Sequence, residues 1–174
     1  MKLEILKFSE RVEIALQVGE SHFREFKSGF KGSPDKKVPR HWKEISKDIG
    51  DTLVGFANSD GGELLVGVED DGTVTGLDLP DNDLDNLLRA PRYQVHADTP
   101  LPTPWANKHI YNDKLILYFS VPKGTDFVYL TSDGRCLQRK DRDTVPVASE
   151  HITFSRGEIE SRQSLEPNHV KIII

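Results

Sequence analysis

The clearest pattern in the chain is a run of apolar residues that recurs at helical spacing in its first half. The recurring positions follow one another at three- or four-residue steps, and they are Trp42, Ile45, Ile49, Leu53 and Phe56. Residues at these steps share one face of a helix. The spacing therefore predicts a helix of about four to five turns with one buried stripe.

Weaker helix signals flank this segment on both sides. Ser9 can cap a helix over 9–17, and Gly19 can end that helix. A second helix is predicted over 80–90, with leucines on its buried side. A third is predicted over 149–163, followed by an apolar tail at 170–174 that we interpret as an added strand or a cut end.

The remaining pattern predicts short strands and turns. Alternation predicts a strand at 23–27, and a continuous apolar run predicts a buried strand at 63–69. Residues 28–40 are rich in Gly, Pro and Lys and predict a mobile loop. Further strands are expected, with turns between them, at 73–76, 109–111, 115–121, 127–131 and 136–139. Helices and hairpins in this order favour an α+β fold with a mixed sheet.

Length and composition place few restrictions on the class of protein. At 174 residues we expect a single domain over 1–174, with its core at about 19–149 and a C-terminal helix and tail at 150–174. No apolar run approaches the roughly 20 residues of a membrane helix, and no signal peptide is evident. The single cysteine, Cys136, excludes an internal disulfide and favours a cytoplasmic location.

The net charge of -5 argues against a general nucleic-acid binder, but the basic residues are concentrated in two clusters. We predict that these clusters form a basic face that contacts nucleic acid. The predicted contact residues are Lys31, Lys36, Lys37, Arg40, Lys43, Lys47, Arg135, Arg139, Lys140 and Arg142. Ordinary solvated charge is the alternative interpretation of both clusters.

Acidic residues gather at two other places, on either side of the long helix. Glu20 and Glu25 flank the start of the first predicted strand, and Asp70 follows the buried strand. Carboxylates brought together from separate elements hold Mg²⁺ or Mn²⁺ in proteins. Lys27 lies two residues after Glu25, so both side chains share one face of the strand.

Each of these acidic features also has a structural interpretation. Glu25 and Lys27 can form a simple ion pair on one strand face. Asp70 and Asp71 can serve only as turn residues before Gly72. No phosphate-binding glycine loop precedes a helix, so nucleotide hydrolysis has little support.

Taken in order, these motifs resemble the Schlafen/AlbA_2 domain family. The shared pattern is Glu-Ser-x-x-x-Glu-Phe-Lys at 20–27, Phe-Ala-Asn-x-x-Gly-Gly at 56–62, and a glycine-containing apolar strand with acids at 64–71. Gly76 and the segment from Val121 to Arg139 also fit. The resemblance covers about 19–149.

The resemblance implies an α+β fold and a nuclease activity on tRNA and rRNA. The family's three acids match Glu20, Glu25 and Asp70, and we assign Lys27 to the same site. The implied function is a metal-dependent endoribonuclease that uses Mg²⁺ or Mn²⁺, with a guessed role in antiviral defence. The alternative is a non-catalytic nucleic-acid-binding module, perhaps specific for DNA.

Vertebrate members of the family have two lobes and a zinc site. This chain is long enough for one lobe, and one cysteine is too few for that zinc site. We therefore expect a homodimer to restore the two-lobed groove.

Overall fold

The computed structural model describes residues 2–153, with residues 2–6 described as backbone only. Four of the eight strands in these residues form one mixed sheet with the order β1-β4-β6-β5, and the other four form two separate pairs. The strands of the mixed sheet are β1 (Arg24–Lys27), β4 (Gly61–Val66), β5 (Trp105–Tyr111) and β6 (Lys114–Pro122). β1 pairs with β4 in parallel, whereas the other pairs are antiparallel, so β1 is an edge strand.

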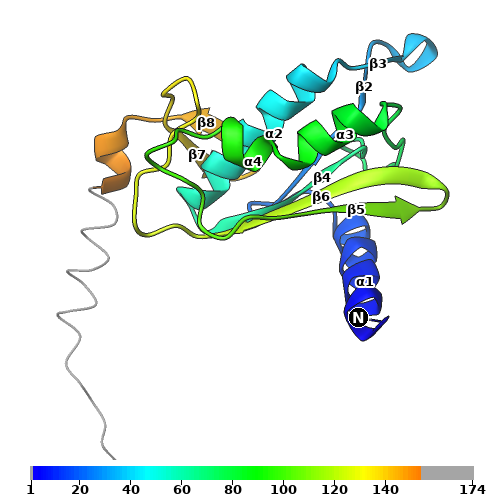
Figure 1. The fold of residues 1–174 in the computed structure, drawn as a ribbon, viewed down its shortest axis with the longest axis horizontal. Coiled ribbons are helices and arrows are strands. Elements are labelled where there is room, and N and C mark those ends of the chain that lie inside the picture. Colours follow the sequence, from blue (N-terminus) through cyan, green and yellow to red (C-terminus); the bar gives the residue numbers. More distant parts are fainter. Residues whose placement is uncertain (1, 154–174) are drawn as a thin grey trace, which may run out of the picture.

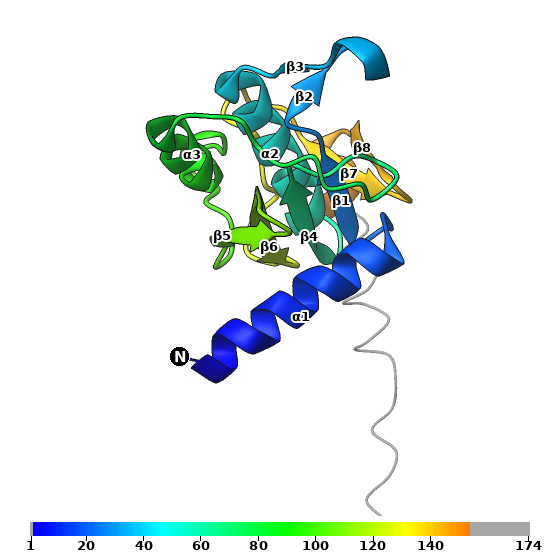
Figure 2. The same ribbon diagram turned by 90° about the vertical axis from the view of Figure 1, so that its right-hand side faces the viewer.

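Helices cover both faces of this sheet. On one face lie α2 (Trp42–Ala57), α3 (Asp81–Leu88) and the single turn α4 (Ala90–Tyr93). On the opposite face α1 (Lys2–Val18) crosses the strands, as Figure 2 shows. The resulting layers of helices and mixed sheet (Figure 1) confirm the expected α+β class.

The periodic apolar stripe lies where the sequence predicts it. Ile45, Ile49, Leu53 and Phe56 are fully buried on α2, against the face of the sheet that includes Leu64. On the other face, alternate strand residues pack against α1; they are Phe26, Leu65, Ile116 and Tyr118. The alternation along each strand therefore supplies two separate apolar layers.

Several predicted boundaries differ from those of the structure. α1 begins at Lys2 rather than at Ser9. β4 ends at Val66, because Gly67 has a φ of 97° and turns the chain; beyond it a single bridge joins Val68 to Val74. Of the helix predicted over 149–163, residues 149–153 are helical. The rest of that helix and the predicted tail lie outside the described residues.

One predicted loop and one predicted strand pairing differ from the structure. Residues 28–40, predicted as a mobile loop, contain the paired strands β2 (Phe30–Lys31) and β3 (Val38–Pro39), with a 3₁₀ turn η1 (Pro34–Lys36) between them. The strands expected at 127–131 and 136–139 were predicted to pair across the turn at 132–134, but a single bridge from Leu130 to Cys136 joins them, and β7 (Leu137–Lys140) pairs with β8 (Asp143–Pro146). The left-handed turn that joins β7 to β8 was not evident from the sequence.

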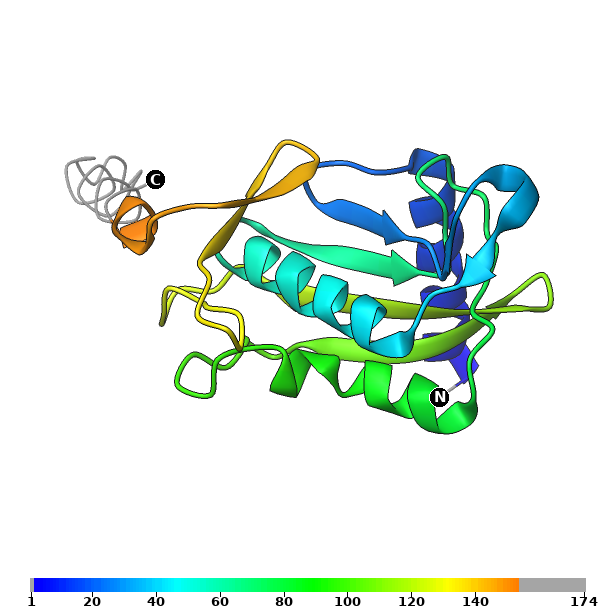
Figure 3. The same ribbon diagram turned by 90° about the horizontal axis from the view of Figure 1, so that it is seen from above.

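The β7–β8 hairpin lies beside the edge strand β1 and the end of α2, as the view from above shows (Figure 3). This arrangement brings a late segment of the chain against the first strand. Within residues 2–153, no helix is both long enough and apolar enough to cross a membrane.

Candidate functional site

The predicted site residues gather around the outer edge of β1. An edge strand leaves backbone groups without a neighbouring strand. Here Glu20 Oε1 accepts a hydrogen bond from the Phe26 backbone N–H at 2.9 Å. Arg139 Nη2 donates to the backbone oxygens of Ser21 at 2.9 Å and Arg24 at 3.3 Å. Glu20 and Arg139, both predicted site residues, therefore form hydrogen bonds with backbone groups at this edge of the sheet.

Glu25 points from β1 toward the α2 side of the sheet, where it meets two cations. Its Oε2 lies 2.5 Å from Arg139 Nη1, and its Oε1 contacts Lys27 Nζ. The contact with Arg139 is ionic rather than a well-aligned hydrogen bond, because Glu25 Oε2 and Arg139 Nε have no hydrogen-bond partner among the described residues. The Glu25–Lys27 ion pair considered from the sequence is therefore present.

Arg139 is placed differently from its prediction as a nucleic-acid contact. Its side chain is 0% exposed, and its guanidinium lies 5.1 Å above the ring of Phe56. With its charge facing Glu25 and its donors directed at β1, the side chain does not reach the surface. We therefore remove Arg139 from the residues expected to touch phosphates.

Electrostatics connect Glu20 with the other two acids. Burial raises the pKa of the Glu20 carboxyl, and the charges of Glu25 and Asp70 raise it further. The hydrogen bond from the Phe26 N–H and the charge of Lys27 act in the opposite direction, but the net shift is upward. Acids from three separate segments therefore share one electrostatic environment.

Asp70 is exposed, and the structure gives it no hydrogen bond or ion pair within the part of the chain that it describes. The neighbouring Asp71 is the turn residue, because its Oδ1 accepts a hydrogen bond from the Thr73 N–H at 2.8 Å. The turn interpretation thus applies to Asp71, and it leaves the carboxylate of Asp70 available.

The three acids fit a divalent metal only in part. Among residues 7–153, whose side chains the structure describes, no three His, Cys, Asp or Glu side chains form a group that could hold a metal ion. Both oxygens of Glu25 already face cations. Mg²⁺ is commonly held by one or two carboxylates together with water and substrate phosphate. Glu20 and Asp70 are the two acids of the set that have no ion pair among residues 7–153.

A polar cavity of about 400 Å³ opens beside Glu25, between β1, α2 and the β7–β8 hairpin. Lys27, Arg135 and Arg142 supply positive charge to its lining, and Asp51 is an acid of the same cavity. Ion pairs hold part of this charge, because Arg135 Nη2 lies 2.6 Å from Asp51 Oδ1. Glu25 therefore lines a cavity whose other lining residues include both cations and acids.

Most cations of the predicted basic face already have acidic partners. The pairs are Lys31 with Glu44, Lys37 with Glu69, Arg40 with Asp48, Lys47 with Asp51, and Arg135 with Asp51 and Asp133. Lys43 lies 5.7 Å from the Trp42 ring. Lys36, Lys140 and Arg142 have no ion pair among the described residues. The face is therefore less positive than the residue count suggests.

The structure also reveals a buried cluster that sequence reasoning missed. Glu63 is 6% exposed and accepts hydrogen bonds from Arg11 at 3.0 Å, Arg24 at 2.7 Å and Tyr118 at 2.7 Å. Burial alone would raise the pKa of Glu63, but these bonds lower it overall. The partners lie 39 to 55 residues away in sequence, so no local pattern announces them.

Comparisons with known proteins agree with this architecture. The family described as Schlafen, AlbA_2 matches residues 20–148. Among solved structures, the DIP2311 protein from Corynebacterium diphtheriae is similar, with a TM-score of 0.58 and 20% sequence identity. That similarity covers 85% of this chain and 25% of the other, so this chain spans about a quarter of that protein's length. No curated protein matches this chain.

At 20% identity the structural similarity concerns the fold alone. The family match is the stronger finding, because it covers most of the chain and includes Glu20, Glu25 and Asp70. It confirms the resemblance seen in the sequence. The protein belongs to the Schlafen, AlbA_2 family of nucleic-acid-related domains.

Proposed function

We propose that this protein is an endoribonuclease that cleaves tRNA or similarly structured RNA with the help of Mg²⁺ or Mn²⁺. The observation that carries the proposal is that Glu20, Glu25 and Asp70, which match the family's three acids, lie within the residues matched by the family. Their charges also act on one another, because burial and then the charges of Glu25 and Asp70 raise the pKa of Glu20. Carboxylates that repel one another in this way are stabilised by a divalent cation.

In this proposal the acids have different tasks. Glu20 and Asp70 hold the metal together with water and a substrate phosphate. The metal supplies stabilisation of negative charge on the leaving oxygen. Glu25 holds the Lys27 amine in place, and Arg139 in turn holds Glu25. Lys27 lines the polar cavity, where its charge can contact a phosphate next to the bond that is cut.

RNA would approach through the basic residues that lack acidic partners, namely Lys36, Lys140 and Arg142, with Lys43 beside Trp42. The lysines and arginines that are already paired with carboxylates must give up those contacts to bind a phosphate. Each of them therefore contributes less free energy to RNA binding than an unpaired cation does. Recognition of folded RNA relies mainly on backbone and shape contacts. We therefore expect salt-dependent binding of modest slope.

We also propose that two copies associate, so that a second lobe completes the groove for RNA. Sedimentation of the protein with and without tRNA measures the copy number directly. A monomer that retains full cleavage activity contradicts this part of the proposal.

A second candidate function is nucleic-acid binding without cleavage. It is favoured by one observation: Glu25 is already neutralised by Lys27 and Arg139, so the three acids do not form a ready metal cage. In this case Glu20 and Arg139 serve chiefly to complete the edge of β1.

A cleavage assay separates the two candidates. The protein is incubated with total tRNA and with single-stranded DNA, in the presence of Mg²⁺, Mn²⁺ or EDTA. Metal-dependent cutting of tRNA, lost in Glu20→Gln and Asp70→Asn, supports the nuclease. Salt-sensitive binding that survives both substitutions, without cutting under any condition, supports the binding module.

A further inference from the structure

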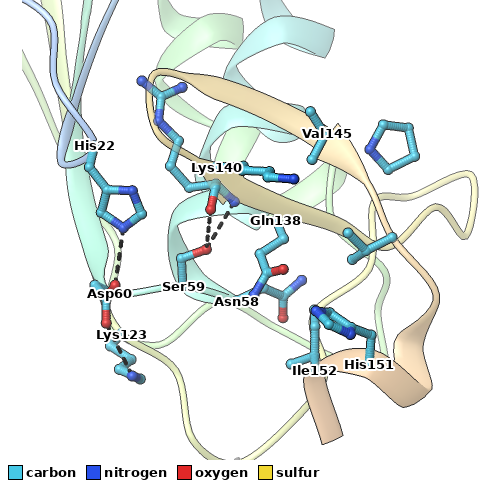
Figure 4. Close-up of a pocket in the computed structure, with 13 residues that line it drawn as sticks. His22, Asn58, Ser59, Asp60, Lys123, Gln138, Lys140, Val145, His151 and Ile152 are labelled. Carbon is cyan, nitrogen blue, oxygen red and sulfur yellow. Dashed lines mark hydrogen bonds and ion pairs between the residues drawn. The ribbon is translucent and has the colours of Figure 1, made fainter. Parts of the chain in front are cut away.

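A cavity of about 520 Å³ lies against the β7–β8 hairpin (Figure 4), and none of the three carboxylates lines it. It is bounded by the hairpin, by the end of α2 and by the start of β4. Its volume falls in the range of small-ligand sites, roughly 300–1,000 Å³. Its two walls differ in chemistry, and that difference indicates what it binds.

The polar wall is formed by His22, Asp60 and Lys123, and the Asp60 carboxylate contacts the other two side chains. Asp60 Oδ2 lies 3.0 Å from His22 Nε2, and Asp60 Oδ1 lies 3.2 Å from Lys123 Nζ. Burial would raise the pKa of Asp60, but the hydrogen bonds from His22 and Lys123 lower it overall. Asp60 therefore stays ionised and holds both side chains at the rim of the cavity (Figure 4).

Positive charge exceeds negative charge around this rim. Lys140 also lines the cavity, and it has no ion pair among the described residues. The lining therefore contains two lysines, Lys123 and Lys140, and a single exposed acid, Asp60. An anionic group, such as a phosphate, would find one lysine unpaired and a second lysine already oriented.

The opposite wall combines apolar side chains with His151 and one free amide. Val145 and Ile152 line it, and Gln138 projects between them and the polar rim (Figure 4). The Gln138 amide has no hydrogen bond among residues 2–153, although it offers both donors and an acceptor. In contrast, the amide of Asn58 is fully used, because it bonds the backbone of Tyr129 and Leu137. Gln138 is thus the group available to recognise a ligand.

We propose that this cavity binds one unstacked nucleotide of an RNA strand. The base lies against Val145 and Ile152 with its edge at the Gln138 amide. The phosphate lies at Lys123 and Lys140, next to His22. Proteins recognise single-stranded RNA by splaying out bases, packing their faces and bonding their edges, and the two walls match those needs.

Two residues that line this cavity lie close to the candidate site with the carboxylates. His22 follows Glu20 by two residues, and Arg139 both lines this cavity and faces Glu25. A nucleotide held here would therefore belong to the strand whose neighbouring phosphate reaches Glu20 and Asp70. Only this placement rests on the proposed function; the binding of a nucleotide does not.

Calorimetric titration with the four nucleoside 5′-monophosphates, the free nucleosides and inorganic phosphate tests the inference. We expect at least one monophosphate to bind more tightly than its nucleoside and than phosphate. Lys123→Ala should weaken that binding by about 5- to 20-fold, as expected for the loss of one charge-assisted contact. Gln138→Met should reduce the discrimination among bases by about 5-fold or more.

The matched control is Lys108→Ala, which removes the same charge from β5, where Lys108 pairs with Asp85. It should leave every affinity unchanged. Monophosphates that bind no better than inorganic phosphate would reduce the cavity to an anion site and overturn the inference. Absence of all binding, or equal weakening by Lys108→Ala, would overturn it as well. Metal-dependent tRNA cleavage with no mononucleotide binding would refute the inference alone and leave the proposed function standing.

Discussion

Replacing Arg139 by methionine removes the buried cation that faces Glu25. Methionine keeps much of the length and apolar contact of the side chain, so packing changes little. Four polar contacts are lost, namely the ion pair at 2.5 Å, the hydrogen bonds to the backbone oxygens of Ser21 and Arg24, and a long hydrogen bond to Thr144 Oγ1 at 3.4 Å. The carboxylate of Glu25, whose side chain is 9% exposed, remains in place.

The expected loss of stability follows from that burial. Removing one partner of a buried ion pair costs about 3–5 kcal/mol. Lys27 stays beside Glu25 and offsets part of the cost, so we expect the lower end, about 3 kcal/mol. For a chain of this size the midpoint of thermal unfolding should fall by about 6–12 °C.

Urea unfolding measures this loss, followed by circular dichroism and by the fluorescence of Trp42 and Trp105. The slope of the free energy of unfolding against urea concentration should be the same in the variant as in the wild type. Glu25→Gln combined with Arg139→Met should be less destabilising than the sum of the single changes, because the two groups interact directly. Arg142→Met is the matched control, since Arg142 is exposed and has no ion pair among the described residues.

The reasoning would be refuted if Arg139→Met unfolded at the same urea concentration as Arg142→Met. Strict additivity of the changes at Glu25 and Arg139 would also contradict it. Either result would return Arg139 to the set of possible nucleic-acid contacts.

Three further predictions concern the fold that supports the site. Glu63→Gln should lower the free energy of unfolding by about 2 kcal/mol at pH 7. The pKa of Glu63 is lowered in the fold, so the difference in stability between the wild type and the variant should shrink as pH falls through that pKa. Urea unfolding at several pH values measures this difference. Asn58→Ala removes three buried hydrogen bonds, two to the backbone of Tyr129 and one to that of Leu137 in β7. It should cost about 2–4 kcal/mol by urea unfolding, and less than 1 kcal/mol would contradict this. Gly62→Ala places a Cβ 2.5 Å from the ring of Phe56 and should lower stability by about 1–3 kcal/mol, whereas an unchanged thermal midpoint would show that the ring moves aside freely.

The sequence predicted those parts of the fold that depend on local patterns. The stripe on α2 is determined by residues three and four apart, and the buried strand that begins at Gly61 is a continuous apolar run. The helix was found where expected, and the strand was found two to three residues earlier than predicted. The hairpin β7–β8 was missed, because its turn contains no glycine; Asp141 adopts the left-handed conformation there, with a φ of 54°.

The residues of the candidate site were proposed from the sequence, but their contacts were not. Glu20, Glu25 and Asp70 come from recognisable motifs, and the charges of Glu25 and Asp70 contribute to the raised pKa of Glu20. The pairing of Glu25 with Arg139 joins residues more than a hundred positions apart. No local spacing specifies such a pair, because it depends on how β7 lies against β1. The contacts of Asp60 with His22 and Lys123 depend in the same way on the tertiary fold.

The central claim is tested most directly at Asp70, because its carboxylate is exposed and supports no other contact in the described chain. Single-turnover cleavage of tRNA with Mg²⁺ or Mn²⁺ is compared for wild type, Asp70→Asn and the control Asp98→Asn, whose side chain is 89% exposed. The account predicts that Asp70→Asn lowers the rate by at least about 100-fold. Its tRNA affinity and thermal midpoint should stay near those of Asp98→Asn. Equal cleavage by Asp70→Asn and Asp98→Asn would contradict the claim that these acids form the catalytic site.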